Sequence, residues 1–330
     1  MTPPTTVSIL SARPPRTPLP APRARKTFSV HETFSLDVPP SYTIEGYAEP
    51  DRETPAIDSG YVFPHEDTLA FLLGLQTGDR ILIHGHTGTG KTSLVEQVAA
   101  RLGFNVVKIN FDGGIGRDDL IGTHVVRGGE VVFQYGILPR AYRDFEGCFV
   151  LLDEWDSISD ECSFVLQRPL QKDDGKLLIL ENGGEVVSLP AGHHIIATAN
   201  TCGQGDETGL YATGTRVQNY AQLNRFGTTI KLGYLGAAEE VEMLLARFAH
   251  AGFRKVEAEL FVRILGKVRE GFAAGTLSSP LSSRDLINWV EKFLAIGDAG
   301  KAAKYAFLNR LPAEDAEAIR SLLQRGGASS

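Results

Sequence analysis

Short apolar runs punctuate the middle of the chain, and each has the length of a β-strand. Clear examples are residues 81–83 and 148–152. Their apolar residues are consecutive, as in strands of a parallel sheet that are buried on both faces. Between such runs lie segments whose apolar residues recur at helical spacing, for example residues 93–102. This alternation predicts an α/β fold built on a parallel sheet.

Two other segments have the alternating pattern and the turn glycines of antiparallel hairpins. The first spans residues 124–133, and the second joins 177–180 to 184–189. From residue 237 onward the apolar spacing is helical throughout. We therefore expect an α/β core that carries two inserted hairpins and is followed by helices.

The composition changes along the chain and indicates its domain boundaries. Residues 1–27 are rich in proline, threonine and arginine, so we expect a disordered arm there. Residues 28–59 carry scattered aromatic residues between prolines and acids, which we interpret as an extended lead-in. We expect the α/β core at residues 60–233 and a helical lid at residues 236–325.

A glycine-rich turn follows the first of the apolar runs. It has the spacing Gly85-x-x-x-x-Gly90-Lys91-Thr92 and opens a helix, which is the context of a phosphate-binding P-loop. The glycines allow backbone N–H groups to point at phosphates where the helix dipole favours negative charge. Lys91 would reach the β/γ-phosphates, and the Thr92 hydroxyl would ligate Mg²⁺. A chance glycine turn is the alternative, but the flanking strand and helix disfavour it. The predicted nucleotide-binding residues are Gly85, His86, Thr87, Gly88, Thr89, Gly90, Lys91, Thr92 and Ser93.

Polar residues follow two further apolar runs at their C-terminal ends. Asp153 and Glu154 end the run that begins at Cys148, and Asn200 ends the run that begins at His193. The C-terminal ends of parallel strands are where open α/β sheets bind ligands. Asp153 suits Mg²⁺, directly or through water, and Glu154 suits orienting or deprotonating the attacking water. Asn200 can hydrogen-bond the γ-phosphate or that water. An acidic turn without function is the alternative reading of the two carboxylates.

The overall composition excludes some classes of function. A net charge of −7 argues against general nucleic-acid binding. The cysteines Cys148, Cys162 and Cys202 lack Cys-x-x-Cys spacing and are interpreted as reduced thiols of a cytosolic protein. No apolar run approaches the ~20 residues needed to span a bilayer, and no signal-peptide core follows Met1. We therefore expect a cytoplasmic protein without a membrane segment.

The motif order resembles the MoxR branch of the AAA+ ATPases and, within it, the CobS group of aerobic cobaltochelatase ATPase subunits. The likeness covers about residues 30–310. Its motifs are Walker A (residues 85–92), Walker B (151–154), a sensor-1 asparagine (Asn200), Asn-Arg-Phe at 224–226 and Ser-Ser-Arg at 282–284. The two predicted hairpins fall where this branch carries its helix-2 insert and its pre-sensor-1 hairpin.

The resemblance implies roles that spacing alone does not. Arg225 aligns with the arginine finger that reaches the γ-phosphate of a neighbouring subunit, and Arg284 aligns with sensor 2 of the lid. Residue type alone would favour a surface ion pair for both arginines. The resemblance also implies ATP and Mg²⁺ as cofactors and a homo-oligomeric, hexameric ring.

The resemblance leaves two functions open. In the first, ATP hydrolysis drives cobalt insertion into a corrinoid ring by a large chelatase subunit, with a metal-binding-domain adaptor (CobN- and CobT-like partners). In the second, the ring is a MoxR-type chaperone that remodels a protein, such as a von Willebrand-type partner, without tetrapyrrole chemistry. A nucleotide-gated binding module with little turnover is disfavoured, because Glu154, Asn200 and Arg225 are all present.

Overall fold

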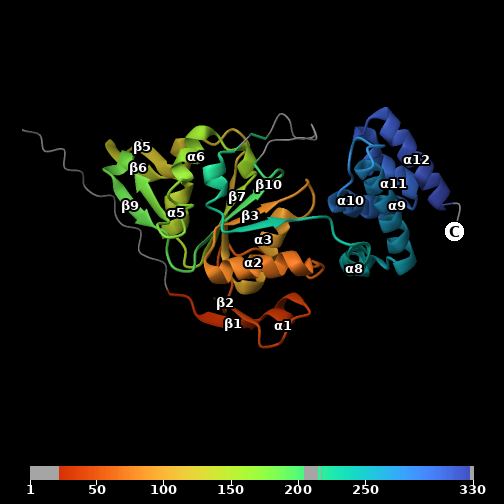
Figure 1. The fold of residues 1–330 in the computed structure, drawn as a ribbon, viewed down its shortest axis with the longest axis horizontal. Coiled ribbons are helices and arrows are strands. Elements are labelled where there is room, and N and C mark those ends of the chain that lie inside the picture. The colour runs from red at the N-terminus through yellow and green to blue at the C-terminus, as the bar shows by residue number, and fades with distance from the viewer. Residues whose placement is uncertain (1–21, 204–214, 217, 328–330) are drawn as a thin grey trace, which may run out of the picture.

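A computed structural model of the protein describes residues 22–203, 215, 216 and 218–327. At its centre, a parallel sheet of five strands has the order β11–β3–β10–β7–β4 (Figure 1). The strands are β3 (Ile81–His84), β4 (Asn105–Asn110), β7 (Cys148–Asp153), β10 (His194–Ala199) and β11 (Thr228–Lys231). The predicted α/β fold with a parallel sheet is confirmed.

The strand register brings the predicted motifs to one edge of the sheet. Asn110 pairs with Asp153 at the C-terminal ends of β4 and β7. The P-loop follows β3, Glu154 follows β7 and Asn200 follows β10. Because the strands are parallel, all these segments leave the sheet at its carboxyl edge.

Helices cover both faces of the sheet, and β7 shows why its sequence is apolar throughout. The helices of the core are α2 (His65–Thr77), α3 (Lys91–Leu102), α4 (Arg117–Ile121), α5 (Ile137–Arg143), α6 (Asp160–Leu166) and α7 (Tyr220–Leu223). Phe149 of β7 packs in the cluster that contains Phe71 of α2 and Leu94 of α3. The next residue, Val150, packs in the opposite cluster with Leu138 of α5. Alternate side chains of the strand are therefore buried under different helices.

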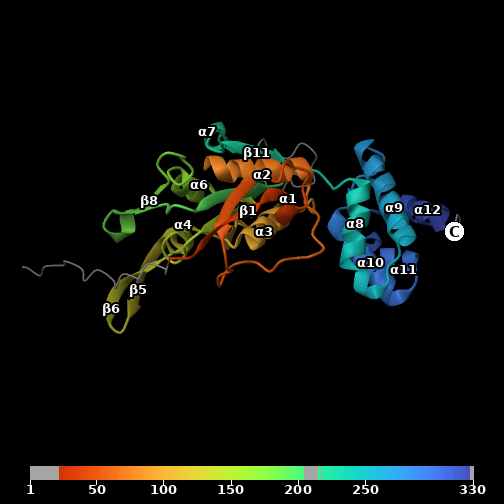
Figure 2. The ribbon, with the colours of Figure 1, turned by 90° about the horizontal axis from the view of Figure 1, so that it is seen from below.

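Both predicted hairpins are present at the end of the core that lies away from the C-terminal helices (Figures 1 and 2). The first consists of β5 (Gly122–Arg127) and β6 (Glu130–Tyr135), and the second of β8 (Lys176–Ile179) and β9 (Glu185–Ser188). The Tyr135 hydroxyl donates to Glu185 at 2.7 Å, which joins the two hairpins. Near the turn of the first hairpin, Val126 and Val131 are 73% and 68% exposed.

The N-terminal segment differs from the prediction. Its elements are β1 (Arg25–Ser29), α1 (Val30–Phe34) and β2 (Thr43–Tyr47), and β1 pairs antiparallel with β2. The strand β1 therefore begins inside the range 1–27 that was predicted to be disordered. Tyr47 explains the difference, because the guanidinium groups of Arg23 and Arg25 lie 4.3 and 5.2 Å from its buried ring. Residues 1–21 of the predicted arm lie outside the described residues.

Helices C-terminal to residue 236 enclose a hydrophobic core of their own. They are α8 (Ala237–Arg247), α9 (Lys255–Ala273), α10 (Ser283–Ile296), α11 (Ala299–Ala306) and α12 (Ala313–Gly327). Trp289 of α10 contacts Phe261 of α9 with ring centroids 4.2 Å apart and Phe307 with centroids 5.5 Å apart. Figures 1 and 2 show these helices beside the sheet, connected to β11 by a short linker. Within the described residues, no helix is long and apolar enough to cross a membrane.

Candidate active site

The P-loop curves around the side chain of Lys91. Gly90 precedes α3 with φ 92°, a conformation that favours glycine, and a Cβ at Gly90 would project into open space. Lys91 Nζ donates to the carbonyl oxygens of Gly85 and His86, at 2.7 and 3.1 Å. Burial lowers the pKa of Lys91 to about 8, although nearby carboxylates oppose the shift. The loop therefore holds a cation beside a helix N-terminus, an arrangement that suits a polyphosphate.

Thr92 and Asp153 meet at the head of α3. The Thr92 hydroxyl donates to Asp153 Oδ1 at 3.1 Å, and the buried Thr198 hydroxyl of β10 donates to the same oxygen. Burial acts to raise the pKa of Asp153, but hydrogen bonds from Lys108, Thr198 and Thr92 hold it below its usual value. Asp153 is therefore a carboxylate that stays ionised. The sequence offered no signal for Thr198, because its role depends on β10 pairing beside β7.

Glu154 has an unusual backbone conformation. Its φ of 55° makes it one of two non-glycine residues with positive φ in the described part of the chain. Such a conformation costs about 1–3 kcal/mol and is often found at functional sites. The turn directs Glu154 into the cavity that also contains Lys91 and Asp153.

Asn200 lies across the P-loop from α3. Its Oδ1 accepts hydrogen bonds from Lys91 Nζ at 3.0 Å and from the Thr87 hydroxyl at 3.3 Å. The buried carboxylate of Asp156 accepts from the backbone N–H groups of Asn200 and Thr201, at 3.0 and 2.9 Å. Asp156 therefore positions Asn200. Ser159 provides the cap of α6.

Arg284 reaches the phosphate cavity from the first turn of α10. Ser282 packs so closely on the P-loop that a Cβ at Gly88 would overlap it. Among the described residues Arg284 forms no ion pair, so the surface ion pair considered for it is absent from this part of the chain. Lid and P-loop of the same chain are in direct contact.

Arg225 lies outside this cavity. Its guanidinium donates to the Ala221 carbonyl at 2.7 Å, and within the described residues it forms no ion pair. Tyr220 of α7 is 74% exposed, and Phe164 of α6 is 67% exposed. Hydrogen bonds between Ser163 and Gln222 hold α6 against α7. We call Arg225, Tyr220 and Phe164 together the α7 face.

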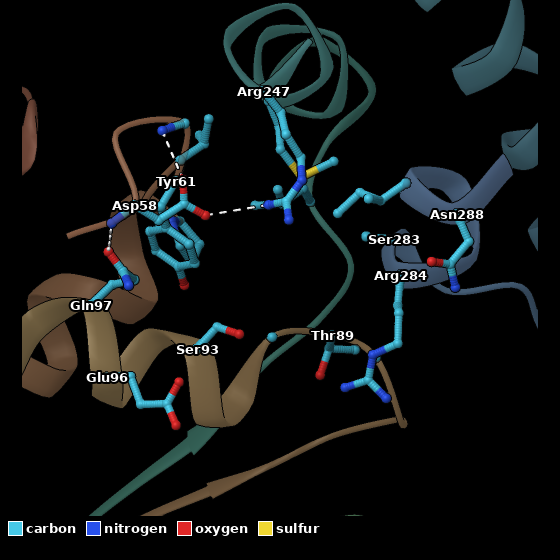
Figure 3. A pocket seen from close by; sticks show the side chains of 18 of the residues that line it. Asp58, Tyr61, Thr89, Ser93, Glu96, Gln97, Arg247, Ser283, Arg284 and Asn288 are labelled. Carbon is cyan, nitrogen blue, oxygen red and sulfur yellow. Dashed lines mark hydrogen bonds and ion pairs between the residues drawn. The ribbon is translucent and has the colours of Figure 1, made fainter. Parts of the chain in front are cut away.

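A second cavity of about 420 Å³ continues from the P-loop between the core and the lid (Figure 3). Tyr61, Val62, Leu235, Met243 and Ile287 contribute apolar surface to it, as a nucleoside base requires. Figure 3 shows Arg247 of α8 reaching the Asp58 carboxylate, 3.3 Å away, across its rim. The sequence did not predict this cavity, because its walls come from segments that are distant in the chain.

The predicted loop residues divide into two groups. Thr87, Gly88, Thr89, Gly90, Lys91, Thr92 and Ser93 line one or both cavities. Gly85 and His86 line neither, and their carbonyl groups hold Lys91 instead. The two cavities together fit a nucleoside triphosphate, with its base between core and lid and its phosphates in the P-loop.

The donors at Thr92 and Asp153 fit Mg²⁺, which prefers oxygen ligands and takes several of them from phosphates and water. Within the described residues, no group of three or more His, Cys, Asp or Glu side chains is placed to hold a metal unaided. The chemistry of the site therefore suits a metal that binds together with the triphosphate.

Fold and site define a P-loop ATPase of the AAA+ class. Residues 80–217 match the family described as the AAA domain of the dynein-related subfamily. The aerobic cobaltochelatase subunit CobS of Sinorhizobium sp. is 36% identical over 291 residues, which cover 86% of this chain and 85% of that protein. Protein NorQ of Paracoccus denitrificans (strain Pd 1222) is 30% identical over 269 residues, covering 81% and 93% of the two chains. The chain belongs to the MoxR branch of the AAA+ ATPases, in the group that contains CobS.

Family membership means that the chain binds ATP and hydrolyses it. Among solved structures, the S. cerevisiae Hsp104:casein complex in its extended conformation superposes with a TM-score of 0.50. The sequence identity is 16%, over 72% of this chain and 44% of that chain, so this likeness concerns the fold alone.

Proposed function

We propose that this ATPase is the motor subunit of an ATP-dependent cobaltochelatase. ATP hydrolysis would drive cobalt insertion into a corrinoid ring, hydrogenobyrinic acid a,c-diamide, by a partner subunit. The similarity to CobS carries the proposal, because it extends over most of both chains. The predicted Walker A, Walker B, sensor-1 and sensor-2 residues also line one cavity. The cobalt and the ring would be held by CobN- and CobT-like partners, a large chelatase subunit and a metal-binding-domain adaptor.

In this proposal the residues of the cavity act in cis on one nucleotide. Lys91 binds the β/γ-phosphates, for which it would exchange the loop carbonyls that it now contacts. Thr92 and Asp153 hold Mg²⁺, which neutralises charge on the phosphates when it is bound. Glu154 orients the attacking water and accepts its proton. Asn200, which follows β10, contacts the γ-phosphate from the sheet. Arg284 contacts it from the helical lid, which we assign to residues 236–325.

One further positive charge at the γ-phosphate, the Arg225 guanidinium, would come from a second copy of the chain. The proposal assigns Arg225 to the γ-phosphate of a neighbouring subunit in a hexameric ring. Two observations support it: Arg225 stays out of its own cavity, and the aromatic side chains of the α7 face, Tyr220 and Phe164, are largely exposed. Exposed aromatic residues and arginine are typical of protein interfaces.

A MoxR-type chaperone that remodels a protein partner is the second candidate. The exposed Val126 and Val131 near the turn of the first hairpin favour it, because they offer apolar contacts to another protein.

Reconstitution distinguishes the two candidates. The purified chain is combined with CobN- and CobT-like subunits, Co²⁺, ATP and hydrogenobyrinic acid a,c-diamide, and corrinoid absorbance is followed. A chelatase subunit gives ATP-dependent cobalt insertion that Lys91→Ala abolishes. If the chain hydrolyses ATP but supports no insertion, the chelatase role is wrong. Stimulation of its ATPase by a von Willebrand-type partner would then identify the chaperone.

A further inference from the structure

Lys108 places an unassigned cation beside the proposed metal position. It lies on β4, two residues before Asn110, and both side chains line the phosphate cavity. Lys108 Nζ is 2.6 Å from Asp153 Oδ2, and 42% of its side chain is exposed. The ammonium group therefore belongs to the wall of the nucleotide site.

The bonds to Asp153 leave neither of its carboxylate oxygens without a donor. Oδ1 accepts from the hydroxyls of Thr92 and Thr198, and Oδ2 contacts Lys108. Two of these partners are neutral hydroxyls, so Lys108 is the cation in direct contact with the carboxylate. Mg²⁺ would compete with this ammonium for the same carboxylate.

The charged side chains that line the phosphate cavity are equal in number only because Lys108 is present. Three carboxylates line it, from Glu96, Asp153 and Glu154, together with three cationic side chains, from Lys91, Lys108 and Arg284. Glu96 lies one helical turn beyond Thr92, where burial raises its pKa and the charge of Lys108 opposes the rise. Removing the Lys108 charge would leave the empty cavity net negative beside two hydroxyl donors.

We propose that Lys108 is the resident counter-cation of the metal position, which neutralises Asp153 without nucleotide and so makes divalent-cation binding depend on the triphosphate. The inference rests on the proposed assignment of Thr92 and Asp153 to Mg²⁺. Lys108 is a positioning residue in this scheme, because it acts on the metal through Asp153. A triphosphate brings enough negative charge to attract the metal while Lys108 stays in place.

An ordinary stabilising ion pair is the competing explanation, and the chain offers a matched control for it. Lys172 Nζ lies 2.7 Å from Asp79 Oδ1, and the Lys172 side chain is 51% exposed. This second lysine–aspartate pair lines neither cavity. Lys172→Met therefore removes a similar ion pair without touching the nucleotide site.

The test titrates Mn²⁺, as a spectroscopic substitute for Mg²⁺, into the full chain and measures free Mn²⁺ by electron paramagnetic resonance. Without nucleotide, Lys108→Met is expected to bind Mn²⁺ at least about tenfold more tightly than the wild type, because a repelling charge is removed. Lys108→Arg and Lys172→Met keep wild-type behaviour, and the double variant Lys108→Met, Asp153→Asn loses the added affinity. With a non-hydrolysable ATP analogue, the wild type binds Mn²⁺.

Two results overturn the inference and are distinguishable. If Lys108→Met without nucleotide binds Mn²⁺ no more tightly than Lys172→Met, Lys108 is not the counter-cation, while the metal assignment stands. If the wild type binds no Mn²⁺ even with the analogue, the metal assignment fails and the inference fails with it. Circular dichroism verifies folding, and Lys108→Gln replaces Lys108→Met in the same comparison if the methionine variant does not fold.

Discussion

The arginine of the phosphate cavity and the arginine of the α7 face point to different places: Arg284 lines the cavity of its own chain, and Arg225 does not. Arg284 comes from the lid of the same chain and lines the cavity with Lys91. Arg225 turns away and bonds the carbonyl of Ala221. Phe226, next to Arg225, nevertheless packs edge-on against Trp155, next to Glu154, with ring centroids 5.2 Å apart. The residue after Arg225 is therefore packed against the residue after Glu154, although the Arg225 side chain does not line the phosphate cavity. This difference is the basis of our proposal that one copy completes the site of another.

The largest expected effect is at the cavity itself. Lys91→Ala should abolish nucleotide binding, because the P-loop then loses its point charge for the β/γ-phosphates. Titration with a fluorescent ATP analogue measures the affinity. Unchanged affinity in this variant would show that Lys91 does not contact the phosphates.

A substitution on the α7 face should slow ATP turnover and leave ATP binding intact. Arg225→Ala should bind ATP almost normally but hydrolyse it about 10³–10⁵-fold more slowly, as for arginine fingers of other NTPases. Phosphate release, with nucleotide affinity as control, checks this. An ion-pair role for Arg225 predicts only a small change in stability, so normal turnover would remove it from the catalytic account.

Glu154→Gln should stall the site after binding. The amide keeps the shape of the side chain but accepts no proton, so turnover should fall by about 10²–10⁴-fold. We expect an ATP-loaded assembly that elutes earlier than the nucleotide-free chain on a sizing column. Near-normal phosphate release would rule out Glu154 as the base.

The smallest expected effect concerns His194, at the opposite end of β10 from Asn200, away from the phosphate cavity and the α7 face. Burial lowers the pKa of His194 to about 4, against about 6.5 in the unfolded chain. Between these values only the unfolded chain takes up the proton, so stability falls as pH falls from about 6.5 to 4. His194→Gln should reduce this slope by about 1 kcal/mol per pH unit and leave ATP turnover unchanged. Urea unfolding at pH 7 and pH 5 measures the slope, and an unchanged slope would exclude titration of His194.

The sequence predicted those features that depend on local pattern. The apolar run of β7 indicated a strand buried on both faces, and the P-loop spacing indicated the turn between β3 and α3. Asp153, Glu154 and Asn200 follow from parallel register, because they end neighbouring strands.

Features made by tertiary contacts were not visible in the sequence. The second cavity, between core and lid, is lined by residues of the lead-in, α3 and the lid. Asp156 likewise accepts a hydrogen bond from Asn200, 44 residues later in the chain. The strand β1 was missed because it is stabilised by packing, in which Arg23 and Arg25 lie against Tyr47. The sequence offered no signal for Lys108, since nothing local shows that β4 pairs beside β7, which ends at Asp153.

Mixing two inactive variants tests most directly whether the catalytic unit spans two copies. Lys91→Ala keeps Arg225, and Arg225→Ala keeps an intact P-loop, so a mixed ring contains interfaces with both groups. The account predicts that the mixture regains part of the wild-type ATPase activity, and that wild-type specific activity rises with protein concentration. A mixture that forms mixed rings yet remains as inactive as its components would contradict a finger supplied by the neighbouring subunit.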